Sequence, residues 1–82
     1  MKVKTEAVWV AFLELRELIS ITGFTEKYFQ RTHGWFSQRL NGNIVNNKVC
    51  EFSTDECNKI ASSFRDLAKR LNEYADAIEK AI

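Results

Sequence analysis

Helix-breaking residues are almost absent from this chain. Its 82 residues include no proline, and glycine occurs only as Gly23, Gly34 and Gly42. Strands need frequent turn residues between them and helices do not, so the sequence favours long helices over a sheet. A chain of this length makes one domain with a modest core, and a subunit contact would be a natural supplement to that core.

An N-terminal helix is expected from Thr5 to Ile19, with Thr5 as its N-cap and Glu6 near the positive end of the helix dipole. More than half of the circumference is apolar in its first turns, including Trp9 and Leu13. Either two neighbouring helices bury this segment, or one flank is a subunit interface. Its core stripe repeats at helical spacing and consists of Val8, Phe12, Leu15 and Ile19.

Two shorter helices are expected between Ser20 and Gly42. They span residues 21–30 and 33–40, and Ser20 and Thr32 are placed to cap their first turns. The second helix ends where Gly42 can adopt the left-handed conformation that closes a helix. Two short helices joined by a turn of about three residues form a helix-turn-helix.

A short β-hairpin is expected within residues 43–52. Two β-forming residues stand on each side of Asn46-Asn47, a pair that tolerates positive φ angles. Arms of two residues are not stable alone, so we expect the hairpin to pack on the helices. The side chains available for that packing are Val45, Val49 and Phe52.

The last helix is expected to begin with a capping box formed by Ser53 and Glu56 and to run from Thr54 to Lys80. At ~1.5 Å per residue it is about 40 Å long, against about 22 Å for the first helix. Its end therefore projects into solvent or packs on another chain, and the apolar Tyr74 and Ile78 favour the second. The apolar residues repeat as in a coiled coil: Cys57, Ile60, Phe64, Leu67, Leu71, Tyr74, Ile78 and Ala81.

The predicted fold is all-α. It is a single four-helix domain over residues 1–82, with a helix-turn-helix at 20–42, a hairpin-like loop at 43–52 and a long C-terminal helix at 54–80. Charge is uneven along it. The whole chain has a formal net charge of +1, residues 25–50 carry four basic groups against one acidic group, and residues 51–82 carry five against seven. The middle segment is therefore basic and the C-terminal part acidic.

Catalysis finds no support in the sequence. No glycine-rich phosphate loop or nucleophile elbow occurs, so we expect no enzyme, cofactor or small-molecule substrate. Cys50, Cys57 and His33 are too few ligands for a zinc site, and we expect free thiols in a reducing cytoplasm. The apolar run at residues 7–13 is too short to span a membrane, which agrees with a cytoplasmic location.

The helix at 33–40 carries the residues that favour nucleic acid. If Phe36 and Leu40 point inward, polar side chains lie outward, and Gln38 can form two hydrogen bonds with adenine. The leading hypothesis is a small DNA-binding regulator that places this helix in the major groove of double-stranded DNA, with the hairpin as a small wing. The candidate DNA contacts are His33, Gly34, Ser37, Gln38, Arg39, Asn41, Asn43, Lys27, Arg31 and Lys48.

Two other interpretations fit the same residues. They can be the plain polar face of a small bundle, in which the stem of Arg39 covers apolar surface and Trp35 packs against the domain. The scaffold can also be a protein-interaction module that does not bind DNA, which the near-neutral total charge favours. We expect a homodimer, and its candidate interface residues are Trp9, Leu13, Leu71, Tyr74 and Ile78.

The stretch from Phe29 to Gly42 resembles the helix-turn-helix of phage Cro/repressor-like proteins. Phe36 takes the place of the buried aliphatic residue, and Gly42 takes that of the terminal glycine. Gln30 stands where the turn glycine is usual, and Arg39 stands where an apolar residue is common. The resemblance implies base contacts from residues 33, 34 and 38 and a phosphate contact from residue 41.

A second resemblance covers roughly residues 20–71. The motif consists of Tyr28-Phe29, Trp35, Arg39 to Asn43, Val45 to Lys48 and Phe52-Ser53. It is similar to a family of short proteins from gut anaerobic bacteria and their phages, catalogued as a domain of unknown function. The resemblance implies a mobile-element context and no assigned activity.

Overall fold

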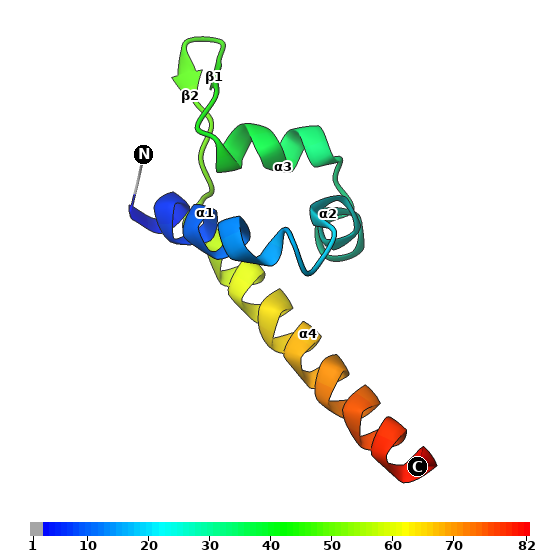
Figure 1. Cartoon of the computed structure of the whole chain (residues 1–82). Helices are drawn as coiled ribbons and strands as arrows, with labels where there is room; N and C mark the ends of the chain where they lie inside the picture. The colour runs from blue at the N-terminus through cyan, green and yellow to red at the C-terminus, as the bar shows by residue number, and fades with distance from the viewer. Residues whose placement is uncertain (1–2) are drawn as a thin grey trace.

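The computed structural model describes residues 3–82, which form four helices and one small hairpin, as expected from the sequence (Figure 1). No helix in this described part combines the length and the apolar character that crossing a bilayer requires. The elements in chain order are α1 (Val3–Leu15), α2 (Ile21–Phe29), α3 (His33–Leu40), β1 (Ile44–Val45), β2 (Lys48–Val49) and α4 (Thr54–Ala81).

The core is built mainly from phenylalanine rings that come from all four helices and from the segment before α4. Phe12 of α1 lies edge-on to Phe24 of α2 and Phe36 of α3, with ring centroids 5.4 and 5.1 Å apart. Phe36 and Phe52 are completely buried and their centroids are 5.0 Å apart. Edge-on and tilted contacts of this kind add to the stabilisation from apolar burial.

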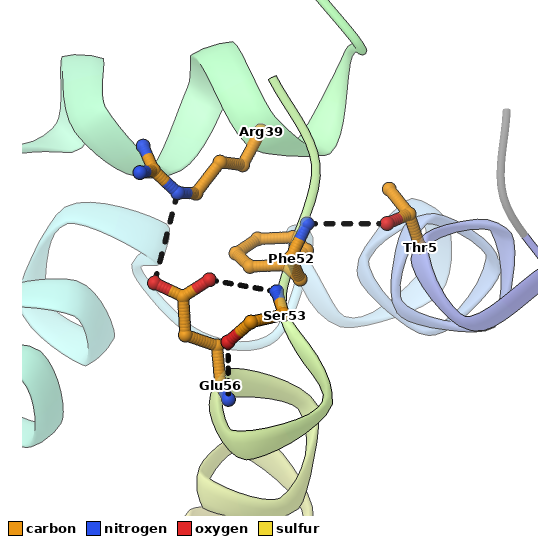
Figure 2. Close-up of polar contacts among 5 residues, drawn as sticks. All are labelled: Thr5, Arg39, Phe52, Ser53 and Glu56. Carbon is orange, nitrogen blue, oxygen red and sulfur yellow. Dashed lines mark hydrogen bonds and ion pairs between the residues drawn. The ribbon is translucent and has the colours of Figure 1, made fainter. Parts of the chain in front are cut away.

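The prediction of Thr5 as the N-cap of the first helix is wrong. α1 begins at Val3, and Thr5 lies inside it, completely buried. Its hydroxyl instead accepts a hydrogen bond of 3.2 Å from the backbone N–H of Phe52 (Figure 2). α1 also ends earlier than expected, at Leu15, because residues 16–18 form a turn that redirects the chain toward α2.

The caps of α2 and α3 confirm the predicted two-helix unit. The Ser20 hydroxyl accepts a 3.0 Å hydrogen bond from the N–H of Gly23, and the Thr32 hydroxyl accepts one of 3.2 Å from Trp35. Gln30 adopts the left-handed conformation, with φ at 52°, so the turn needs no glycine there. Gly42 ends the unit with φ at 67°.

The hairpin forms where it is expected, but it does not pack on the helices. Asn46 and Asn47 have φ angles of 53° and 63°, and Ile44 pairs with Val49. The two strands extend beyond the end of α3, away from the other helices (Figure 1), and Val45 and Val49 are exposed. The expectation that these two valines lean on the helices is therefore wrong. The two-residue strands project from the domain, so their side chains have no helix to pack against. Of the three side chains expected to pack on the helices, Phe52 is the one that is buried.

The long helix α4 has two halves with different surroundings. Its first turn is closed by the predicted capping box, in which Ser53 and Glu56 exchange hydrogen bonds of 2.8 and 3.1 Å. Ile60 is buried against α1, whereas every residue from 71 to 82 is exposed. The second half therefore projects from the domain (Figure 1), which gives the chain extents of 56 × 21 × 20 Å.

Candidate functional site

The outermost face of α3 is polar and uncovered. Phe36 anchors the helix in the core, and helical geometry places residues 34, 38 and 41 on the opposite side. We call Gly34, Gln38 and Asn41 the α3 ridge, and all three are exposed. Arg31, also exposed, precedes α3, and its guanidinium lies 5.3 Å from the centre of the Trp35 ring, on a flank of α3 beside the ridge. The structure thus brings three of the predicted DNA contacts to one side of α3.

A groove between α1 and α3 runs along one flank of the ridge. His33 and Ser37 line its α3 side, together with Asn41, whose amide donates a 3.1 Å hydrogen bond to the Ser37 hydroxyl. Trp9 and Leu13 line its α1 side. These two predicted interface residues therefore face α3. They do not lie near the exposed half of α4.

Arg39 does not lie free on the surface of α3. Its Nε is 3.7 Å from a carboxylate oxygen of Glu56 (Figure 2). Its guanidinium also lies 4.4 Å from the centre of the Trp35 ring. That Nε is buried without a hydrogen-bond partner in the described chain. Glu56 also belongs to the capping box, so Arg39 connects α3 to the first turn of α4. This arrangement matches the interpretation in which the Arg39 stem covers apolar surface.

Trp35 packs against the domain, as expected. It is half-buried, and its ring centroid is 5.5 Å from that of Phe29. The guanidinium of Arg31 lies 5.3 Å from the same ring and that of Arg39 lies 4.4 Å from it. A cation over an indole face is attracted by the ring quadrupole, so Trp35 holds both arginines near α3.

The other predicted DNA contacts lie at two further places. Lys27 lines a groove between α2 and α4, with Leu67 and Arg70, on a different side of the domain from the ridge. Lys48 is exposed on the hairpin. Asn43 fixes the base of the hairpin to α3, because its N–H donates to the Gln38 carbonyl at 2.9 Å and its carbonyl accepts from Cys50 at 2.7 Å.

A polar cluster between α2 and α4 was not found by sequence reasoning. The Tyr28 hydroxyl and Nε of Arg70 each donate a 2.8 Å hydrogen bond to the same carboxylate oxygen of Asp66. The hydrogen bonds from Arg70 and Tyr28 lower the pKa of Asp66. Burial and the bond to Asp66 raise the pKa of Tyr28. Tyr28 and Asp66 are 38 residues apart, so only the i,i+4 spacing of Asp66 and Arg70 could have signalled the cluster.

Within residues 3–82, no three side chains from His, Cys, Asp and Glu lie close enough together to hold a metal ion. Cys50 and Cys57 are half-buried and are not joined by a disulfide. The predicted interface residues of α4 remain at the surface, since Leu71, Tyr74 and Ile78 are 61, 68 and 62% exposed. Two of the uncovered surfaces of the described residues bear on the predicted functions, the α3 ridge and the free half of α4.

Comparisons with known proteins give one match. No curated protein and no solved structure matches the chain. A family model described as a domain of unknown function, DUF5053, matches residues 8–78. This range includes most of α1, all of α2, α3 and the hairpin, and α4 as far as Ile78. The chain therefore belongs to the DUF5053 family.

Proposed function

We propose that this protein is a small DNA-binding regulator that inserts α3 into the major groove, with α2 and α3 acting as a helix-turn-helix of the Cro/repressor type. The observation that carries the proposal is the α3 ridge, a polar, uncovered helix face with a glycine at its N-terminal end. The family resemblance seen in the sequence suggests a phage or mobile-element context. A regulator of this kind would act in the cytoplasm.

The chemistry of the ridge suits base edges. Gln38 and Asn41 carry amide groups, which can donate to and accept from one base at the same time, the pairing that adenine prefers. Arg31 can form a bidentate contact with guanine or bind phosphate. With its side chains an α-helix is about 10–12 Å in diameter, which fits the width of the major groove of B-DNA, about 12 Å.

Gly34 supports a close approach to this face. A glycine within a helix costs up to about 1 kcal/mol relative to alanine. The domain itself does not require it, because a Cβ at residue 34 would meet only the Thr32 hydroxyl, at 3.9 Å. Because residue 34 has no side chain, a partner can approach the backbone of α3 more closely here than elsewhere on the ridge.

The available charges predict a modest electrostatic contribution. Arg31 is exposed beside Trp35 and Lys48 is exposed on β2, and both can contact phosphates, with the hairpin as a small wing. Arg39 is already paired with Glu56, and Lys27 lies by the α2–α4 groove. With about two phosphate contacts, log K should fall with log salt with a slope of about −2.

The test is selection from a pool of random duplexes, followed by fluorescence anisotropy with the selected sequence at ~50 mM salt. We expect Gln38→Ala to reduce the preference for the selected sequence by about 5- to 150-fold, since a bidentate base contact contributes about 1–3 kcal/mol. The matched control is Asn72→Ala, which removes an exposed amide from the far half of α4. Absence of any binding at this salt concentration would overturn the proposal.

A protein-interaction module without DNA binding is the second candidate function. It is favoured by the formal net charge of only +1 and by the exposed apolar side chains on α4. Under this alternative the ridge substitutions leave assembly unchanged, whereas substitutions on the free half of α4 abolish it. Measuring DNA binding and assembly for the same set of variants therefore separates the two functions.

A further inference from the structure

We propose that the free half of α4, residues 71–82, is a self-association surface that pairs antiparallel with the same segment of a second copy of this chain. It carries four large apolar side chains that the domain leaves in water: Leu71, Tyr74, Ile78 and Ile82, which are 61, 68, 62 and 99% exposed. Contiguous exposed apolar side chains of this kind mark interaction sites. The inference uses none of the α3 residues, so it stands with either proposed function.

The exposed residues continue a stripe that is already used for packing. Ile60 is buried and Phe64 and Leu67 are half-buried, and they follow each other at the same alternating spacing of four and three residues as Leu71, Tyr74 and Ile78. This repeat keeps one face of a helix apolar and directs it toward a partner helix. α1 and α2 supply the partner up to Leu67, and nothing in the described chain supplies one beyond it.

Side-chain sizes favour an antiparallel partner. When two such helices run antiparallel, Tyr74 of one can face Ile78 of the second copy, and Leu71 then faces Ala81. Each layer combines a larger side chain with a smaller one. A parallel pair would place Tyr74 against Tyr74 and Ala81 against Ala81, which crowds one layer and leaves another poorly filled.

Alanines flank the exposed stripe. In the antiparallel alignment the two copies of Ala75 face each other on one side of the interface, and the two copies of Ala77 do so on the other. Small side chains there let the helices approach closely. The charged groups of residues 71–82 lie outside the stripe, with one basic group, Lys80, against the acidic groups Glu73, Asp76 and Glu79. The net charge of −2 on each copy opposes association, so apolar contacts must supply the stabilisation, and the dimer should be stronger at higher salt.

The rest of the domain also favours this orientation. α1 and α2 cover the apolar stripe of α4 up to Leu67, and a parallel partner would bring its own α1 and α2 to the same end. An antiparallel partner carries its domain to the opposite end. Its Ile82 would then reach the level of Leu67 and Arg70, beside the apolar groove that Ile19 and Phe24 also line.

The length of the overlap predicts a weak dimer. Twelve residues give a contact about 18 Å long, so we expect an interface among the weak, transient complexes that bury less than about 1,200 Å². We expect a dissociation constant of about 1 µM or weaker. Assembly should be visible as a concentration-dependent change in mass.

The first test is sedimentation equilibrium of the full chain between about 1 µM and about 1 mM. We expect a monomer–dimer equilibrium that Ile78→Asp shifts toward monomer by at least about a hundredfold in Kd, since a charge is then buried opposite Tyr74. Asn72→Asp is the matched control, because it adds the same charge on the outer face of the same helix. A monomeric parent at the highest concentration, or equal effects of the two substitutions, would overturn the proposal.

The second test reads the orientation from the unmodified chain by small-angle X-ray scattering. The single chain is 56 Å long. Two chains that overlap by about 18 Å end to end give a particle roughly 95 Å long. A parallel pair keeps both domains at one end and stays near the length of the single chain. A dimer with that shorter length would refute the antiparallel arrangement, while loss of DNA binding alone would leave it standing.

Discussion

Thr5 and Phe52 lie 47 residues apart in the chain and are joined by a hydrogen bond of 3.2 Å between the Thr5 hydroxyl and the Phe52 backbone N–H. Both residues are completely buried. The bond attaches the segment that follows the hairpin to α1, immediately before Ser53 starts α4. It therefore sets where the long helix begins relative to the rest of the core.

Replacing this hydroxyl by a methyl group should destabilise the fold. Thr5→Val keeps the shape of the side chain but leaves the buried N–H of Phe52 without an acceptor, which costs about 1–3 kcal/mol. Urea denaturation followed by circular dichroism measures the change. Thr5→Ser, which keeps the hydroxyl and removes only the methyl group, should lose less. Equal stability of the valine variant and the parent would show that the bond contributes nothing.

The two arginines near Trp35 should respond differently to substitution. Arg39→Gln removes the contact of the guanidinium with Trp35 and should lower the free energy of unfolding by about 1 kcal/mol, while the salt dependence of DNA binding stays the same. Arg31→Gln should leave stability nearly unchanged and reduce the salt slope by about 0.9. Titrations at several salt concentrations, with urea denaturation of each variant, test both. A reduced slope for Arg39→Gln would mean that Arg39 leaves Glu56 to contact phosphate.

Alanine should have opposite effects at Gly34, inside α3, and at Gly42, just after the end of α3. Gly34→Ala should raise the free energy of unfolding by up to about 1 kcal/mol, because helix propensity improves and its Cβ meets only the Thr32 hydroxyl at 3.9 Å. The same change should weaken DNA binding, because its Cβ lies where the partner approaches the backbone of α3. Gly42→Ala should lower stability by about 1–2 kcal/mol, because φ there is +67°. Denaturation and anisotropy of both variants provide the comparison. If Gly34→Ala binds DNA as the parent does, no close approach occurs there.

The cluster of Tyr28, Asp66 and Arg70 should make stability depend on pH at both extremes. The pKa of Asp66 is lowered in the folded chain, so its contribution is present above the usual carboxyl pKa, about 4, and is lost as pH falls further. The pKa of Tyr28 is raised, so its contribution is present below about pH 10 and is lost as pH rises through the folded value. Denaturation across this pH range should show both losses.

Tyr28→Phe separates the cluster from the general effect of pH. It should remove most of the alkaline loss, and only part of the acid loss, because the Arg70 hydrogen bond remains the main cause of the lowered Asp66 pKa. Identical pH profiles for Tyr28→Phe and the parent would exclude the cluster as the origin.

The parts of the fold that follow from a few neighbouring residues could be predicted from the sequence. Thr32 and the pair Ser53 and Glu56 cap helices through contacts over three residues, so their patterns sufficed. Thr5 shows the limit of such reasoning. A threonine followed by an acidic residue has the same local pattern as a cap, but its hydroxyl is used by a residue far along the chain.

The candidate site was harder to predict because its charges depend on tertiary contacts. Arg39 and Lys27 count as basic groups in the sequence, but Glu56 pairs with the first and α2 directs the second toward α4. The repeat of α4 also predicted an apolar stripe correctly without indicating where the domain stops covering it. Periodicity describes one helix face, and what covers that face is decided by the lengths of α1 and α2.

The ion pair between Arg39 and Glu56 joins α3 to the first turn of α4. The position of α3 is therefore fixed relative to the axis of α4. In an antiparallel dimer centred near Asp76, about 30 Å of helix separates that centre from Glu56, so two α3 helices would lie roughly 60 Å apart. This is far more than one turn of B-DNA, about 35 Å, and about 10 Å less than two turns. The length of α4 would then set the spacing of the two half-sites that a dimer contacts, and lengthening it by one heptad would select more widely spaced sites.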